Sequence, residues 1–152
     1  MHRFKQLSLM SLLLLSLGLQ AAPLSGTQVI PTDYGFSELT SRLQQAIVDN
    51  KMGLVTQASA SRGAASRGIK IPGNMVLGVY RNDFAVRMLK ASVKSGIEAP
   101  IRFYITENPD STATLSYRKP STVFAPYNNQ DLDQMAKELD LIFTRIAVQA
   151  TR

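Results

Sequence analysis

The chain has 152 residues, of which 45% are hydrophobic and 18% are charged, with a formal net charge of +6 and no cysteine. Disulfides and thiolate-bound metals are therefore excluded, and the chain is long enough to bury a core of its own. Its positive charges are scattered, with no run longer than Arg118-Lys119, which is typical of a solvated surface and predicts no binding of nucleic acid.

The first 21 residues have the pattern of a secretory signal peptide. Arg3 and Lys5 precede an apolar run over residues 7–19, and the small residues Ala21 and Ala22 follow. The run is shorter than the roughly 20 residues that span a bilayer, which favours a cleaved signal over an uncleaved anchor. We expect cleavage near Ala21, a periplasmic or secreted protein, and no membrane span after cleavage.

Cleavage would also remove His2, the only histidine in the chain. The mature protein would then contain neither histidine nor cysteine. Nucleophile systems that depend on these residues are excluded, and so are metal sites built from imidazole or thiolate. The sequence predicts no catalytic residue, no metal site and no cofactor, and leaves open only chemistry by carboxylate, lysine or tyrosine side chains.

Residues 22–33 are expected to form a lead-in strand and linker, and a single domain is expected over residues 27–150. Apolar positions at helical spacing predict a helix that begins after Gly35 and ends at Gly53 in a left-handed cap. Next come a strand over residues 54–60, a short helix or turn over 61–68, a Pro72-Gly73 turn and a buried strand over 74–80.

A second helix is predicted to begin at Asp83 and to stop at Gly96. Its predicted buried side comprises Phe84, Met88, Ala91, Val86, Leu89 and Val93. The remaining elements are a strand over 101–107, a turn at 108–111, a strand over 112–118, a loop over 119–127 and a long amphipathic helix over 131–149. The fold class is α+β, a single domain with a mostly antiparallel sheet and helices packed on one face, in the order β-α-β-(short α)-β-α-β-β-α.

Three stretches carry a family resemblance. They are Tyr34-Gly35-Phe36-Ser37-Glu38-Leu39, Met75-Val76-Leu77-Gly78-Val79-Tyr80-Arg81-Asn82-Asp83 and Gly96-Ile97-Glu98-Ala99-Pro100-Ile101-Arg102-Phe103-Tyr104-Ile105. In these the chain resembles the family called domain of unknown function 302, over nearly all of residues 27–150. The resemblance implies a compact α+β domain, with exported members and no established activity. Many members carry an acidic residue or a histidine near residues 59–62, where this chain has Ser61-Arg62, and this weakens a metal or acid–base role there.

Four residues are candidates for a ligand site. Arg102 and Tyr104 lie on the polar face of the strand over 101–107, and Tyr117 and Arg118 lie on the facing strand. Arg102 could donate a bidentate hydrogen bond to an anion, with the tyrosines as walls. The structural alternative is that Arg102 holds the Ala99-Pro100 turn by bonding its carbonyl groups.

Two further segments are candidates for contacts. Arg62 and Arg67 lie in a near-repeat of Ser-Arg-Gly that could bind an anion, or could be an exposed loop. Phe124 and Tyr127 lie in the loop over 119–127 and could form a partner or dimer interface, or Phe124 could close the end of the core.

Together these features favour a non-catalytic periplasmic module that binds a small ligand or a protein partner of the cell envelope. One alternative is a hydrolase-type enzyme that uses carboxylate, lysine or tyrosine chemistry. Another is a structural subunit of an envelope complex, with a homodimer as its simplest form.

Overall fold

The structure is a computed structural model that describes residues 24–152, so the predicted signal peptide and its cleavage site lie outside the described residues. Five strands form one sheet in the order β1-β5-β4-β3-β2, and every neighbouring pair is antiparallel. The strands are β1 (Thr27–Gly35), β2 (Gly53–Ala58), β3 (Asn74–Tyr80), β4 (Ile101–Glu107) and β5 (Thr112–Arg118).

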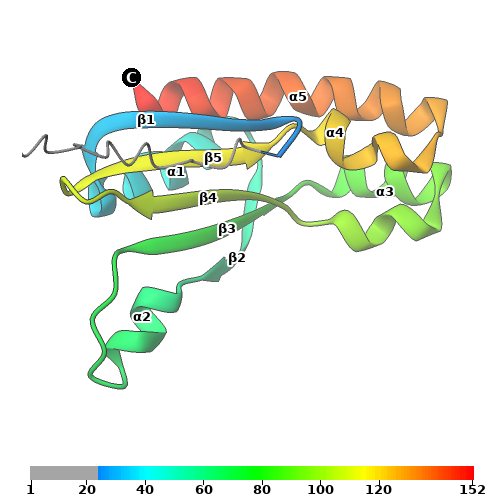
Figure 1. Ribbon diagram of the computed structural model, residues 1–152. Helices are drawn as coiled ribbons and strands as arrows, with labels where there is room; N and C mark the ends of the chain where they lie inside the picture. The colour runs from blue at the N-terminus through cyan, green and yellow to red at the C-terminus, as the bar shows by residue number, and fades with distance from the viewer. Residues whose placement is uncertain (1–23) are drawn as a thin grey trace, which may run out of the picture.

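The helices form a single layer against this sheet (Figure 1). Two of them, α1 (Phe36–Asp49) and α5 (Gln130–Thr151), pack on one face of the sheet, and α3 (Asn82–Ala91) and α4 (Pro120–Phe124) continue the layer beyond the strand ends. The short elements are α2 (Ala60–Ala65), η1 (Val93–Glu98) and η2 (Ala125–Tyr127). The predicted α+β class and order of elements are confirmed.

The core lies between the sheet and the helices because the strands β4 and β5 present buried residues alternately to the helical side. On β4, Ile101, Phe103 and Ile105 are buried, whereas Arg102 and Tyr104 are exposed on the opposite side. The Phe103 ring stacks on Phe143 of α5 with centroids 4.7 Å apart. We call the side of the sheet that carries Arg102 and Tyr104 the open face, since no helix of residues 24–152 covers it.

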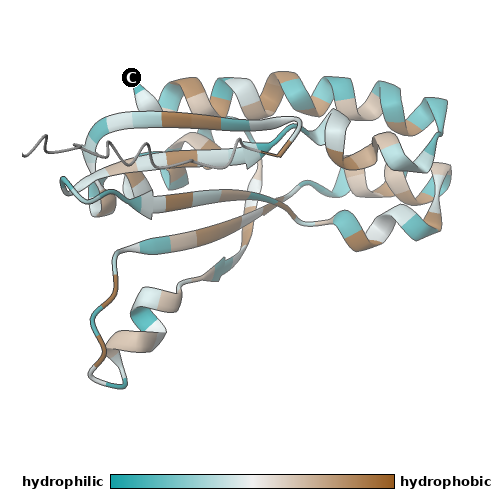
Figure 2. Cartoon of the chain, in the orientation of Figure 1, coloured by the Kyte–Doolittle hydropathy of each residue, from teal (hydrophilic) through white to brown (hydrophobic). Residues whose placement is uncertain are grey.

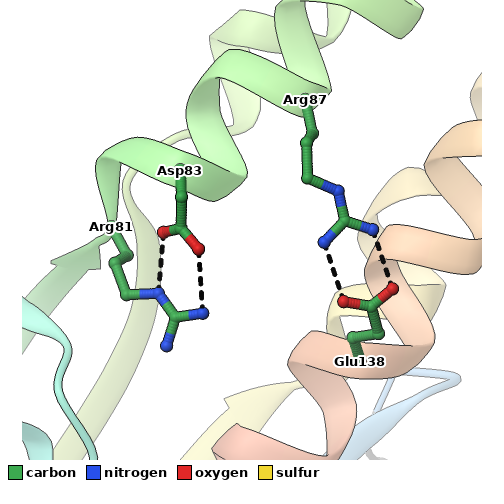
Figure 3. A network of polar contacts seen from close by, with 4 residues as sticks. All are labelled: Arg81, Asp83, Arg87 and Glu138. Carbon is green, nitrogen blue, oxygen red and sulfur yellow. Dashed lines mark hydrogen bonds and ion pairs between the residues drawn. The ribbon is translucent and has the colours of Figure 1, made fainter.

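Ion pairs reinforce the outer side of the helical layer (Figure 3). Arg87 of α3 donates two hydrogen bonds of 2.7 Å to the Glu138 carboxylate of α5. Arg81 pairs with Asp83 at the start of α3, with Nε 2.7 Å from Oδ1. Both pairs are largely solvent-exposed, so each contributes little to stability.

Two helix boundaries differ from the sequence prediction. α1 ends at Asp49, and the residue with positive φ is Lys51, at φ 58°, instead of Gly53. Gly53 already lies in β2, where it pairs with Tyr80. α3 begins one residue before Asp83, with Arg81 as its N-cap residue. Asp83 lies in the first turn, where a carboxylate favours the positive end of the helix dipole.

The predicted loop over residues 119–127 is largely helical, since it forms α4 and η2. Pro120 occupies a first-turn position, where its missing N–H costs nothing. Asp140 of α5 accepts hydrogen bonds from the backbone N–H of Ser121 at 2.9 Å and from its hydroxyl at 2.6 Å. The cap of α4 therefore comes from α5, and no pattern in the neighbouring sequence indicates it.

The buried side of α3 is confirmed in part. Phe84 and Met88 face the core as predicted, with Ala85 beside them, whereas Val86, Leu89 and the following Val93 are exposed. Apolar residues lie on the outer side of this helix as well as on its inner side, so the pattern alone includes too many of them.

Candidate ligand-binding site

Strand register brings the predicted site residues together on the open face. Tyr104 of β4 lies opposite Ser116 of β5 and opposite Val76 of β3. Arg102 lies opposite Gly78 of β3. Gly78 has no side chain, and Thr56 of β2 and Pro100 fill the space beside it on this face.

A hollow of about 340 Å³ opens where β4 begins and β5 ends. Its polar lining comes from Thr27, Glu98, Arg102, Tyr104, Ser116 and Arg118, and its apolar lining comes mainly from Leu24, Val76 and Val123. This volume lies at the lower end of the range for small-molecule sites. The mixture of a few polar groups with apolar walls is also typical of such sites.

Arg102 and Arg118 give the hollow its positive charge. Both are exposed, and neither forms an ion pair or a side-chain hydrogen bond with another residue of the described chain. The alternative role for Arg102, bonding the carbonyls of the Ala99-Pro100 turn, is thus not observed. Two like charges on neighbouring strands repel each other, and a bound anion would relieve that repulsion.

Tyr117 is the buried member of the predicted set of site residues. It is 6% exposed, and its ring packs between Phe103 and Phe143, with centroid distances of 5.2 and 5.8 Å. Burial raises the pKa of its phenol above the ordinary value. Tyr117 borders the hollow but presents its ring to the core, because it lies on the same side of β5 as Ala113 and Leu115.

Glu98 is a member of the site that sequence reasoning missed. It ends η1, and its Oε1 accepts a hydrogen bond of 2.9 Å from the hydroxyl of Tyr127. Burial and the neighbouring Glu98 carboxylate raise the pKa of Tyr127. The half-buried Tyr127 thereby holds a carboxylate at the wall of the hollow. This contact joins two loops, so the sequence carries no signal for it.

Ser116 was also missed, and here a signal exists. A tight turn centred on residues 108–111 fixes the pairing of the two strands and places Ser116 opposite Tyr104.

Arg62 and Arg67 lie elsewhere, on and just after α2, and do not line the hollow. The backbone N–H groups proposed to bind an anion there have partners within the chain. Ser59 Oγ accepts from the N–H of Arg62 at 3.1 Å, and Asn74 Oδ1 accepts from the N–H of Ala60 at 2.8 Å. Only the two exposed guanidinium groups remain available.

Phe124 is 1% exposed and forms part of the core, so it offers no surface to a partner. This agrees with the alternative that it closes the end of the core. It lies 6.4 Å from Tyr127, measured between ring centroids.

Within residues 24–152, no three acidic or histidine side chains gather closely enough to hold a metal ion. Among the helices of the same part of the chain, none has the length and apolar character needed to cross a membrane.

The fold and site together define an α+β domain with one helical layer and an open sheet face that carries a basic hollow. Comparison with known proteins agrees with the α+β fold. The family described as "Domain of unknown function DUF302" matches residues 28–149, and the chain belongs to that family. The resemblance seen in the sequence is thereby confirmed.

Among solved structures, the chain is similar to an uncharacterized conserved DUF302 protein from Bacillus stearothermophilus. The TM-score is 0.72 at 18% sequence identity, and the match covers 84% of this chain and 99% of the other. At this identity the similarity concerns the fold alone. No curated protein matches the chain.

Proposed function

We propose that the protein is an exported, non-catalytic module that binds a small anionic ligand in the hollow of the open face. The observation that carries the proposal is the pair Arg102 and Arg118, which line one hollow without a carboxylate partner in the described chain. Tyr104 is 41% exposed and offers a ring beside them. The ligand class is therefore an oxyanion, a carboxylate or phosphate, attached to a small apolar body.

The hydrolase-type alternative has less support from the geometry. It requires two converging carboxylates or a lysine beside a serine. Glu98 is the one carboxylate that lines the hollow among the described residues, and no lysine of that part lines it. Glu98 also accepts a hydrogen bond from Tyr127, which holds its carboxylate at the wall of the hollow. A negative charge at that wall would repel a second negative group on a ligand.

The ligand proposal is tested by calorimetric titration with benzoate, with its neutral isostere benzamide, and with inorganic phosphate. We expect benzoate to bind and benzamide to bind much more weakly. Arg102→Gln should weaken benzoate binding about 10- to 100-fold, because a hydrogen bond to a charged group contributes about 1.5–3 kcal/mol. Phosphate binding without benzoate binding would show that the apolar body is wrongly assigned.

The matched control is Arg145→Gln, since Arg145 is an exposed arginine on α5, on the helical side of the sheet. It removes the same charge from the protein and should leave benzoate binding unchanged. Equal losses in the two variants would mean that net charge, and not the hollow, attracts the ligand.

Export is tested separately, by fractionating cells that produce the whole chain and by measuring the intact mass of the product. We expect a protein outside the cytoplasm that begins at Ala22. A cytoplasmic product of full mass would contradict export and would leave the ligand proposal standing.

A further inference from the structure

Four aliphatic residues on α3 and on η1, which follows it, have exposed side chains in the described structure. We call Val86, Leu89, Val93 and Ile97 the aliphatic ridge. Val93 and Ile97 are 79% and 84% exposed, the highest values among the large hydrophobic residues of the described chain. Apolar stretches on both elements are visible at the end of the molecule away from the C-terminus (Figures 1 and 2). Clustered exposure of this kind marks an interaction site.

The helix below the ridge already has its core contacts. Phe84 and Met88 are buried on the inner side of α3, and Leu89 packs near Gly96, where an added Cβ would lie 3.0 Å from the Leu89 Cδ2 atom. The ridge is therefore a second apolar side that the fold itself does not need.

Positive charge flanks the ridge. Between Phe84 and Ile97 the sequence contains Arg87, Lys90 and Lys94 and no acidic residue. Arg87 is held by Glu138 of α5. Lys90 and Lys94 are exposed and form no ion pair with another residue of 24–152, although Asp131 borders the same shallow hollow as Lys90.

We propose that the aliphatic ridge docks on an anionic lipid surface, with Val93 and Ile97 entering the headgroup region and Lys90 and Lys94 contacting lipid phosphates. Apolar side chains flanked by lysines are the combination that binds such interfaces. The surface is separate from the anionic-ligand hollow, so the proposal goes beyond the proposed function and does not depend on it.

Two other occupants fit the ridge less well. A second copy docked about a two-fold axis would place the lysine-bearing surfaces of the two copies against each other, which like-charge repulsion disfavours. A protein partner would be recognised mainly through aromatic anchors, and the ridge is purely aliphatic. A lipid surface needs only apolar tips and positive charge.

The absence of cysteine from the chain allows a position-specific test. An Ile97→Cys variant is labelled with the environment-sensitive dye NBD, and Leu141→Cys, at a 63% exposed leucine on α5, serves as the control. Vesicles of phosphatidylcholine with and without phosphatidylglycerol are then added. We expect a blue shift and a severalfold rise in emission at position 97, only with phosphatidylglycerol, and little change at position 141.

A change that is equal at the two positions would overturn the proposal, because residues 1–23 or net charge would then account for binding. No change at position 97 would overturn it directly. A change at position 97 that follows protein concentration in the absence of vesicles would indicate a second copy as the occupant and would also overturn it.

The contribution of the charges is tested in the NBD-labelled Ile97→Cys protein. Lys90→Gln combined with Lys94→Gln should raise the lipid concentration needed for half-maximal signal about 30-fold, at roughly fivefold for each basic residue. Lys137→Gln combined with Arg145→Gln removes the same charge from exposed positions of α5, and should change that concentration less than twofold. The reverse order of effects would place lipid contact on α5 and contradict the proposal.

Discussion

Gly78 shows how one missing side chain allows three segments to meet on the open face. A Cβ atom added there would lie 2.1 Å from Thr56 Oγ1 and 2.9 Å from Pro100 Cγ. Gly78→Ala should therefore lower the free energy of unfolding by about 1–3 kcal/mol, because overpacking forces neighbours to move. Denaturant titration of the purified protein measures this loss.

Gly63 in α2 is the matched control, since an added Cβ would meet nothing within 4 Å. Gly63→Ala should be neutral or stabilise by up to about 1 kcal/mol, because alanine favours a helix over glycine. Similar losses at both positions would show that crowding is not the cause.

Tyr117 makes the free energy of unfolding depend on pH in the alkaline range. Burial raises its pKa in the folded protein above the unfolded value of about 10. The unfolded state therefore loses the phenolic proton first, and the free energy of unfolding falls as pH rises above about 10, by at most about 1.4 kcal/mol per pH unit for this group. Tyr117→Phe should remove that part of the decline, as measured by denaturation at pH 8 and pH 11. Parallel declines in the two proteins would contradict the assignment.

At the scale of elements, α5 joins the whole helical layer. Leu139 is 4% exposed on its inner side, and Leu141 is 63% exposed two residues later. Leu139→Asp should abolish cooperative thermal unfolding, because it places a charge in the core at a cost of several kcal/mol. Leu141→Asp should change stability by about 0.5 kcal/mol or less. Loss of folding in both variants would mean that helix propensity, and not burial, is decisive.

The sequence alone predicts well those elements whose apolar residues repeat with one clear period. β4 and β5 follow from alternation, and α5 follows from its apolar stripe. The buried side predicted for α3 is too wide, because apolar residues also lie on its outer side and only the neighbouring elements determine which of them are buried. α4 was missed because its cap comes from Asp140, nineteen residues further along.

The sequence likewise predicts part of the candidate site and misses the rest. Alternation places Arg102 and Tyr104 on one face, and the tight turn brings Arg118 beside them. The same alternation, continued along β5, directs Tyr117 into the core. Glu98 could not be found, because its position depends on the path of η1 and on the contact with Tyr127.

At the scale of the whole molecule, the segment between β2 and β3 projects away from the body (Figure 1). No residue of α2 is buried, and the base of the segment is held by polar contacts. Glu107 accepts from the N–H of Gly73 at 2.6 Å, and the N–H of Glu107 donates to the Gly73 carbonyl at 2.8 Å. This segment lacks the apolar contacts that protect the rest of the chain from local opening.

Hydrogen exchange should reveal that difference. Amides of α2 should exchange through local opening, with a free energy several kcal/mol below that of the amides of β4, which should need global unfolding. Mass spectrometry of peptides from the two regions measures both. Equal protection of α2 and β4 would mean that the projecting segment folds as one unit with the core.

The pairing of the first strand with the last has a consequence for the order of events in folding. Thr27 of β1 lies beside Arg118 of β5, and no nearer strand neighbours β1. The hairpin of β4 and β5 closes a short loop, whereas β1 must wait until β5 has been synthesised. A chain still emerging from the ribosome therefore keeps this edge unpaired until late, and contacts so distant in sequence slow the folding rate. Until β5 has been synthesised, the ladder hydrogen bonds of β1 therefore have no partner strand within the described chain.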